Sequence, residues 1–376
     1  MKARKIIAML LALVMALALC ACGGGSNNNT PDTTPNSDSS STDTTPKADD
    51  GKVYELVVQN HDPATSMCAQ YLQDWTDLIT EASDGRLTFI IYNGGALGTA
   101  GESCDLVLNG TADIAWTTCG MNPGRFSYSD VLLIPGVSVN GNDSAKIAWE
   151  LYNTSELVQN EWSYWKILSY SGGASRPFST IGKKIESPSD FKGLRIRATT
   201  GTDISFTEAC GATAMSFNIT DTFENLEKHV ADGVRDDWHA MKAFSMADVV
   251  DYTTNQTFGT GHQCMIMNWD SYNNLPDDLR AILDEYSGEY AAKMAGEYWD
   301  SCQATEVEIL QEAGVELYDL SQEVQDFCAE ACEKAFDQWV ESMNSQGYDG
   351  NAIARDYRNA VKNAVGYEID FLEKYA

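Results

Sequence analysis

The sequence predicts an α/β protein of two domains, with helices packed on a largely parallel sheet. A chain of 376 residues is long enough for two domains. Hydrophobic residues make up 43% of it, which is sufficient for buried cores. Between residues 191 and 238, segments of strand length alternate with segments of helix length. This alternation is typical of parallel strands joined by helical crossovers.

The segment 191–238 gives the clearest pattern. Leu194 and Ile196 are apolar at a spacing of two, which predicts a short strand. Residues 206–210 are expected on a helix that ends at Gly211, a residue type common after helix C-termini. The alternation then continues with a strand over 213–217, a helix over 220–229 and a strand over 231–234.

Outside this segment, period and turn residues predict strands over 53–59, 87–92, 165–170 and 263–269, with helices over 67–82 and 102–108. The glycines at 172–173 are expected to end one strand, and those at 259 and 261 to form a turn that enters another. Pro276 and the acids after it indicate a helix start. That helix is expected to run to about residue 313, followed by a short strand and a helix capped by Ser321.

Arg197 stands at the carboxyl end of the first strand of the segment 191–238. Ligands of open α/β sheets bind beyond the carboxyl ends of the strands. A guanidinium group can hold a carboxylate with two parallel hydrogen bonds. Arg195 shares a strand face with Arg197 but lies farther from that end. We therefore expect Arg197 to be the principal carboxylate partner, the alternative being a salt bridge to an acidic side chain.

Several motifs in this segment resemble one receptor family. Gly193-Leu194-Arg195-Ile196-Arg197, Gly211-Ala212-Thr213 and the spaced residues from Asp221 to Gly233 resemble the solute-binding receptors of tripartite ATP-independent periplasmic (TRAP) transporters, the family of C4-dicarboxylate-binding subunits. The sequences Asn93–Gly98, Gly110–Ile114 and Leu275–Leu279 resemble further motifs of that family. The chain departs from the pattern at Ala214, at His229 and at Asp236, where the family commonly has proline, glycine and asparagine.

The resemblance covers about residues 54–346 and implies a two-domain periplasmic-binding-protein-like (type II) fold, with a ligand cleft between the domains and long C-terminal helices. It implies an extracytoplasmic receptor that captures a small organic acid by hinge closure and delivers it to membrane permease subunits. A sugar acid or an amino-acid-like compound is the alternative ligand. An exported hydrolase and an envelope protein without a small-molecule ligand are the alternatives of other classes.

The resemblance also nominates ligand-binding residues. Arg176 matches an arginine that often reaches the ligand just past the crossing between the domains. Asp236 and Asp237 are candidates to hold a cation or an amino group, or to oppose a second carboxylate. Three aromatic residues could shape the body of the ligand or simply pack in a core: Trp116, Phe217 and Trp238. An ordinary surface or interdomain salt bridge is the alternative role for Arg176.

The N-terminal residues predict export and lipid anchoring. A basic start is followed by an apolar stretch over residues 6–19, too short for a membrane span. Leu19-Cys20-Ala21-Cys22-Gly23 resembles a bacterial lipobox, so Cys22 is the expected lipidated residue. Cleavage without lipid and a retained short anchor are the alternatives. Residues 23–50 have no large apolar side chain and are expected to form a disordered linker between a membrane anchor and the domains.

The expected domains are residues 51–174 with 261–298, and residues 175–260 with 299–376. A formal net charge of −30 argues against nucleic acid as a partner. The four histidines show no metal-ligand spacing, and no nucleophile elbow or phosphate loop is present. No catalytic residue, metal or cofactor is therefore expected.

Eight cysteines follow Cys20 and Cys22 in the sequence. An even number in an exported chain is compatible with disulfides. Their spacing shows no disulfide framework, however, and several fall on apolar helix faces where cysteine packs as a small hydrophobic residue. We therefore expect mostly buried free thiols.

Overall fold

The computed structural model describes residues 51–376 except 123, 138–139 and 200; the predicted signal, Cys22 and linker lie outside the described residues. One mixed sheet has the strand order β2-β1-β3-β8-β4-β7-β5-β6, and β9 pairs with β8. The strands are β1 (Tyr54–Asn60), β2 (Leu87–Tyr92), β3 (Ile114–Thr117), β4 (Lys166–Thr180), β5 (Arg195–Arg197), β6 (Thr213–Met215), β7 (Gly233–Val234), β8 (Tyr252–Met267) and β9 (Glu316–Tyr318).

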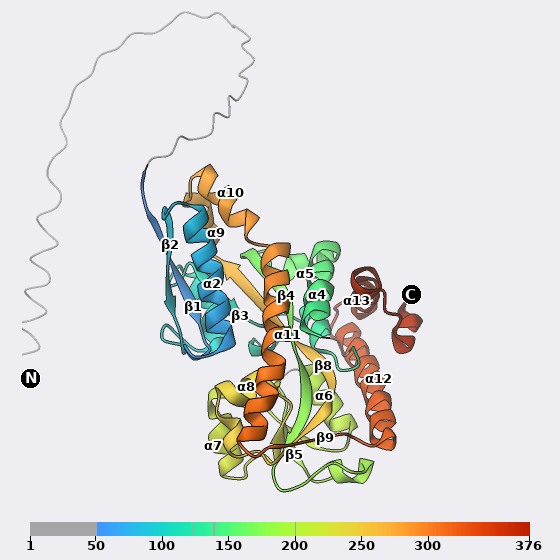
Figure 1. Cartoon of the computed structure of the whole chain (residues 1–376). Helices are drawn as coiled ribbons and strands as arrows, with labels where there is room; N and C mark the ends of the chain where they lie inside the picture. The colour runs from blue at the N-terminus through green and yellow to red at the C-terminus, as the bar shows by residue number, and fades with distance from the viewer. Residues whose placement is uncertain (1–50, 123, 138–139, 200) are drawn as a thin grey trace, which may run out of the picture. The chain divides into compact units, whose positions relative to one another are not determined.

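Two long antiparallel strands, β4 and β8, run through the middle of this sheet (Figure 1). The C-terminal end of β8 pairs with β3, where Cys264 lies opposite Thr117. The C-terminal end of β4, at the opposite end of the two-stranded ladder, pairs with β7, where Ser179 lies opposite Val234. The same two strands therefore belong to both halves of the sheet. The expected domain boundaries at 174/175 and 260/261 lie inside them, and the domain assignment stays a prediction.

The strands expected at 165–170 and 263–269 were predicted too short. β4 continues past Gly172 and Gly173, and β8 begins at Tyr252, well before Gly259 and Gly261. These glycines were expected at strand ends, but they lie inside the strands and permit the close approach of the two backbones. A Cβ on Gly173 would lie 3.1 Å from the Cα of Gly261 on the paired strand. The register of the β4–β8 ladder also shifts between Gly172 and Ser175.

The first half of the sheet is built on β1, which pairs in parallel with β2 and β3. A core between this sheet and α2 buries large side chains such as Trp75 and Tyr71. A second core lies against α4 and α13 and includes Trp162 and Tyr170. The helices up to β4 are α2 (Met67–Ala82), α3 (Ser103–Leu108), α4 (Gly141–Thr154) and α5 (Glu156–Glu161).

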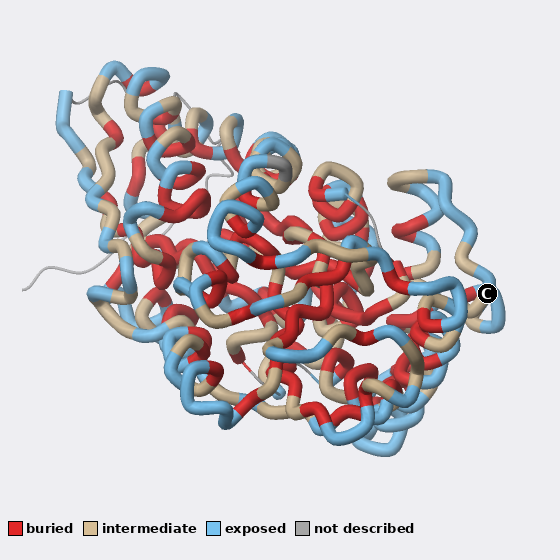
Figure 2. Tube along the Cα trace, turned by 60° about the horizontal axis from the view of Figure 1, so that its bottom comes forward, coloured by how far each residue is buried: buried red, intermediate tan, exposed pale blue. Residues whose placement is uncertain are grey.

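The second half has the parallel alternation that the segment 191–238 predicted. β5 pairs in parallel with β6 and β7. Its helices are α6 (Gly201–Ala209), α7 (Thr222–Glu227) and α8 (Trp238–Ala243). Two apolar clusters fill this half, one between β5, α6 and α12 and one around α7 and α8. Figure 2 shows buried residues along the inner elements and exposed residues on the outer turns of the helices.

The C-terminal part is helical, as expected, with α9 (Trp269–Asn274), α10 (Asp277–Glu285), α11 (Glu289–Glu312), α12 (Gln322–Ser345) and α13 (Gly350–Val365). The single helix expected from 276 to about 313 is two helices. Gly288 has a φ of 64°, and its N–H donates to the carbonyl of Leu168 on β4 at 2.6 Å, which ends one helix before the next begins. α11 then packs against elements of both halves, including α2, α4 and α8.

α13 packs against α4 and shares a core with the first half of the chain. The expected domain assignment had placed residues 299–376 with the second half. Among the described residues, no helix is both long and apolar enough to cross a membrane.

The eight cysteines of the described residues are free thiols, seven of them buried, which confirms the expectation from their spacing. The seven buried cysteines all lie in the apolar clusters of the two halves, where sulfur packs as a small apolar group: Cys68, Cys104, Cys119, Cys210, Cys264, Cys328 and Cys332.

Alkylation of the unreduced, denatured protein should therefore label all eight of these cysteines. Peptide mass spectrometry gives the label at each position, and a prior reduction step should add nothing within residues 51–376. Recovery of disulfide-linked peptides from the unreduced sample would contradict this prediction.

Candidate functional site

A cavity lies where the two halves of the sheet meet the long strands. Its walls come from the loop after β1, from α2, from the middle of β4 and β8, from the β7–α8 connection and from α11. The lining residues are His61, Asp62, Cys68, Thr118, Met121, Gly173, Arg176, Ile219, Asp236, Asp237, His239, Ala240, Phe244, Gly261, His262, Gln263 and Trp299. The carboxyl ends of the parallel strands β1 and β7 both lead into it, as expected for a ligand site in an α/β sheet.

Arg176 projects into this cavity from β4. Its Nη1 lies 3.7 Å from Oδ2 of Asp203, and its side chain is 13% exposed. Nε and Nη1 are buried and make no hydrogen bond to any described residue. Buried polar groups are nearly always hydrogen-bonded in native proteins, so this guanidinium is poised to donate to a ligand.

Arg197 is buried and already engaged. Its Nη1 donates to Oδ2 of Asp236 at 2.5 Å, and its Nε donates to the carbonyl of Phe217 at 3.2 Å. Only Nη2 lacks a partner within the described part of the chain. Asp236 thus neutralises the charge of Arg197, and Arg197 is not among the residues that line the cavity. Its expected role as principal carboxylate partner stays a prediction.

Arg195 faces elsewhere. Its Nε and Nη2 donate to the two oxygens of Asp232 at 2.9 and 2.7 Å, and its side chain is 42% exposed. This is a peripheral ion pair, in which the hydrogen bonds to Arg195 lower the pKa of the Asp232 carboxyl.

Sequence reasoning missed Arg235, which is buried directly after β7. Its Nε donates to Oδ1 of Asp203 at 2.6 Å, and its Nη2 to the carbonyl of Phe258 at 2.5 Å. Its guanidinium also lies over the rings of Phe178 and Phe206. Arg235 therefore fixes the carboxylate beside Arg176. Its position after the last strand of the segment 191–238 was a usable signal, identical in kind to that of Arg197.

His262 on β8 is a second buried donor that sequence reasoning missed. Its Nδ1 accepts a hydrogen bond from the backbone N–H of Cys119 at 3.2 Å. Burial lowers the pKa of the imidazole to about 3, so the ring is neutral and its proton is on Nε2. Nε2 is buried and finds no acceptor in the described structure, and Oε1 of neighbouring Gln263 is likewise buried without a donor. Only a structure could reveal this, because the tautomer depends on a contact across the sheet.

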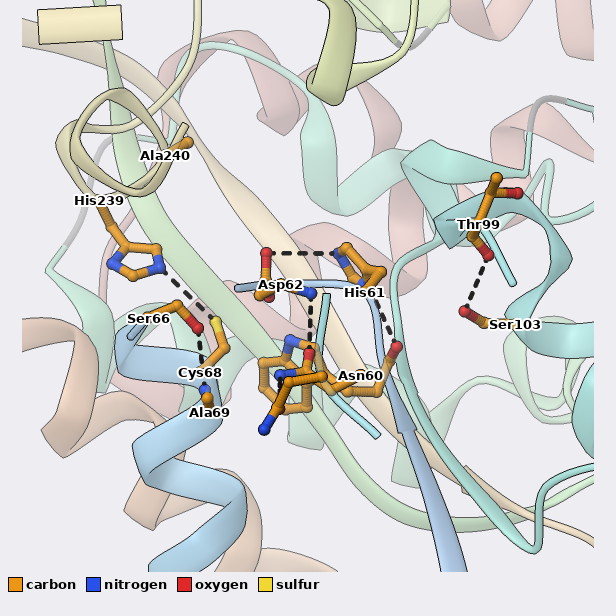
Figure 3. Close-up of polar contacts among 12 residues, drawn as sticks. Asn60, His61, Asp62, Ser66, Cys68, Ala69, Thr99, Ser103, His239 and Ala240 are labelled. Atoms are coloured by element: carbon orange, nitrogen blue, oxygen red, sulfur yellow. Dashed lines mark hydrogen bonds and ion pairs between the residues drawn. The ribbon is translucent and has the colours of Figure 1, made fainter. Parts of the chain in front are cut away.

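Two carboxylates approach the cavity from opposite halves. Asp62 follows β1, is 6% exposed, and has Oδ1 3.7 Å from Nε2 of His61 (Figure 3). Asp237 caps α8, since its Oδ1 accepts from the N–H of Ala240 at 2.9 Å. Burial raises the pKa of the Asp237 carboxyl to about 6. An aspartate in this state is held close to the point where its negative charge is lost.

His239 contacts both halves and α11. Its Nδ1 lies 2.6 Å from Oε1 of Glu306, and its Nε2 faces the sulfur of Cys68 at 3.9 Å (Figure 3). Burial alone would lower the pKa of His239, but the hydrogen bond and charge of Glu306 more than offset it, so the pKa is raised. The raised pKa favours the protonated imidazole and thus an ion pair with Glu306.

The aromatic side chains of the cavity are Phe244 and Trp299. Trp116 lies in the core of the first half, and Nε1 of Trp238 donates to Oγ1 of Thr253 at 3.1 Å. Phe217 packs on the core of the second half. Of the six expected ligand residues, the cavity brings together Arg176 and Asp236.

Known proteins resemble this chain over most of its length. A family model described as bacterial extracellular solute-binding protein, family 7, matches residues 58–343. This chain belongs to that family. The family 7 assignment confirms the resemblance read from the motifs and gives the molecule an extracytoplasmic solute-binding role.

Individual relatives of this family 7 protein are distant. A solute-binding protein of Chromohalobacter salexigens is 22% identical over 69% of this chain and 77% of its own length. A marine metagenome TRAP solute-binding protein, specific for aromatic acid ligands and crystallised with 3-hydroxybenzoate, has a TM-score of 0.79 at 24% identity, covering 84% of this chain and 99% of its own. A Bordetella bronchiseptica TRAP protein with bound mandelate has a TM-score of 0.74 at 24% identity, over 82% and 99%. These structures confirm the two-domain periplasmic-binding fold.

Asp237→Asn should stabilise the ligand-free protein at pH 7.5. The raised pKa means that the folded state binds a proton more tightly than the unfolded state, so wild-type stability falls as pH rises from about 4 to about 6. Asparagine caps a helix equally well but carries no charge. We expect a gain on the order of 1–3 kcal/mol in unfolding free energy at pH 7.5, vanishing near pH 4. Urea unfolding at the two pH values measures it.

Asp232→Asn is the matched control, because the pKa of Asp232 is lowered by Arg195. Its substitution should lower the unfolding free energy at pH 7.5, by about 1 kcal/mol or less. A loss of stability at pH 7.5 in both variants would show that ionised Asp237 does not lower the unfolding free energy of the protein.

Proposed function

We propose that this family 7 protein is the receptor of a TRAP-type transporter, which captures a small organic acid between its two halves and delivers it to membrane permease subunits. The observation that carries the proposal is Arg176. Its Nε and Nη1 are buried at the cavity between the two halves, and they have no hydrogen-bond partner among the described residues. A ligand carboxylate could accept a charge-assisted hydrogen bond from either of these nitrogens.

Capture would work by hinge closure. The cavity is lined by Asp62 of the first half and by Asp237 of the second, so a ligand contacts both halves only when they are together. Ligand contacts that exist only in the closed form shift the population toward it. Nε2 of His262 offers one further donor from the strand shared by the halves.

We propose no covalent chemistry at this site. Burial, and then the charge of Asp62, raise the pKa of the Cys68 thiol well above its usual value, which leaves it protonated and a poor nucleophile. His262 is neutral and holds its only basic nitrogen in the hydrogen bond from Cys119. These features favour a receptor over an exported hydrolase.

The rings of Phe244 and Trp299 support a ligand with an apolar body. Proteins of the same fold carry 3-hydroxybenzoate or mandelate, both acids with an aromatic ring. A sugar acid or an amino-acid-like compound is the alternative ligand class.

Arg176→Ala should weaken binding of a cognate acid by about 10²-fold or more, because the ligand carboxylate would lose its desolvated partner. Arg176→Lys should also weaken it, since an ammonium cannot reproduce the planar geometry of a guanidinium. A thermal-shift screen against benzoate, 3-hydroxybenzoate, mandelate and sugar acids finds a ligand, and titration calorimetry measures the variants.

Arg195→Ala is the control, and it should change affinity by less than about tenfold because Arg195 is engaged by Asp232 at the periphery. Arg197→Ala separates the two buried arginines. If that variant folds and loses binding while Arg176→Ala retains it, Arg197 is the carboxylate partner and the assignment to Arg176 is wrong.

We also propose that the protein is held at the membrane by lipid on Cys22, with residues 23–50 as a tether to the domains. The support is the lipobox-like sequence ending at Cys22 and the polar composition that follows it. Stable attachment requires more than one acyl chain, as a diacylated cysteine provides.

Cys22→Ser should move the protein from the membrane fraction to the soluble fraction of the cells that express it. The measurement is fractionation with a high-salt wash, followed by immunoblotting. A variant that stays with washed membranes would contradict lipid anchoring through Cys22.

A further inference from the structure

Most charges around the cavity cancel in pairs. Arg197 is matched by Asp236, Arg235 by Asp203, and His239 by Glu306. Each of these pairs is buried and joined by a contact of 2.6 Å or less. They form a neutral frame around the cavity, to whose lining Asp236 and His239 themselves belong.

Three charged lining groups stand outside this frame: Arg176, Asp62 and Asp237. Nδ1 of His61 donates to the carbonyl of Trp116 at 3.2 Å, and its Nε2 lies 3.7 Å from Oδ1 of Asp62, beyond hydrogen-bonding distance. One guanidinium therefore faces two carboxylates. An ordinary anion would bring further negative charge to a site already short of positive charge, in surroundings where like charges repel strongly.

The unsatisfied hydrogen-bonding groups divide in the same way. On the donor side are Nε and Nη1 of Arg176, Nε1 of Trp299 and Nε2 of His262, which is fully buried. On the acceptor side is Oε1 of Gln263, and the carboxylates of Asp62 and Asp237 in the lining add oxygens that can accept further hydrogen bonds. A carboxylate has only acceptors and an ammonium has three donors, so one molecule that carries both would satisfy both sets.

We propose that the cavity binds a zwitterion, with its carboxylate on Arg176 and His262 and its protonated amine between Asp62 and Asp237. The inference rests on the proposed function and narrows its ligand class to amino acids and related amino-carboxylates. The ammonium would also lie near the rings of Phe244 and Trp299, whose faces attract cations. It would return the pKa of Asp237 toward its usual value, which recovers the cost of burying that carboxylate.

A metal ion is the other cation that carboxylates could hold. Within the described residues, no group of three or more His, Cys, Asp or Glu side chains is arranged to bind one. The carboxylates of the cavity approach from different halves and are separately engaged by protein groups, which suits a ligand that spans them.

Matched ligand pairs test the inference. Phenylglycine has the skeleton of mandelate with an ammonium in place of the hydroxyl, and 3-(aminomethyl)benzoate relates to 3-hydroxybenzoate in a similar way. Titration calorimetry at pH 7.5 with these pairs, and with a set of common α-amino acids, should find a zwitterion that binds at least about tenfold more tightly than any acid without an amine.

The outcomes separate the two proposals. Tight binding of mandelate or 3-hydroxybenzoate, with no binding of any amino-carboxylate, would overturn the inference and leave the receptor function standing. Failure of every acid to bind, with or without an amine, would count against both. Binding of benzylamine as tightly as of the zwitterion would remove the role of Arg176.

Charge-removing variants provide the second arm. Asp62→Asn and Asp237→Asn should each weaken zwitterion binding by at least about tenfold and improve binding of the matched hydroxy acid, because a carboxylate is removed. Asp232→Asn, an equivalent substitution outside the cavity, should leave both affinities unchanged. Wild-type preference for the zwitterion in both cavity variants would overturn the inference.

Discussion

The antiparallel pairing of β4 with β8 is the interaction on which the rest of the molecule depends. These strands carry the first half of the sheet at one end and the second half at the other. Near their middle, Gly173 and Gly261 approach so closely that a Cβ on Gly173 would lie 3.1 Å from backbone. Arg176 and His262 extend from the same region into the cavity. The position of both buried donors is thus set by main-chain geometry shared between the halves.

Around this ladder, burial of charge is arranged in complementary pairs. Removing a charge from water is expensive unless a partner replaces the solvent. Arg235 meets that requirement through Asp203, a carbonyl and two aromatic faces. Arg176 meets it only in part, since Asp203 is 3.7 Å away. Arg197 and Arg235 each keep one buried nitrogen without a hydrogen-bond partner among the described residues, whereas Arg176 keeps two and is the one of these three arginines that lines the cavity.

Local patterns in the sequence were enough for the α/β alternation, because period-two apolar residues such as Leu194 and Ile196 and a helix cap such as Ser321 act over a few positions. Local patterns did not predict the full length of β4 and β8, because a glycine inside a strand resembles a strand end when only its sequence neighbours are considered. The motif that contains β5 drew attention to Arg197, but the neutralisation of Arg197 by Asp236 joins residues 39 apart in sequence. The tautomer of His262 depends on Cys119, 143 residues away. Site chemistry of this kind depends on tertiary contacts between residues that are far apart in the sequence.

The raised pKa of Asp237 affects how often an empty receptor closes and reaches the permease. If the halves close without a ligand, the carboxylate loses water and gains no cation, so empty closure is penalised. If the ligand carries the proposed ammonium group, a loaded receptor escapes this penalty because the ligand supplies the missing positive charge. A permease that recognises the closed form would then meet few empty receptors. Asp237 would thereby reduce the docking of receptors that carry no ligand.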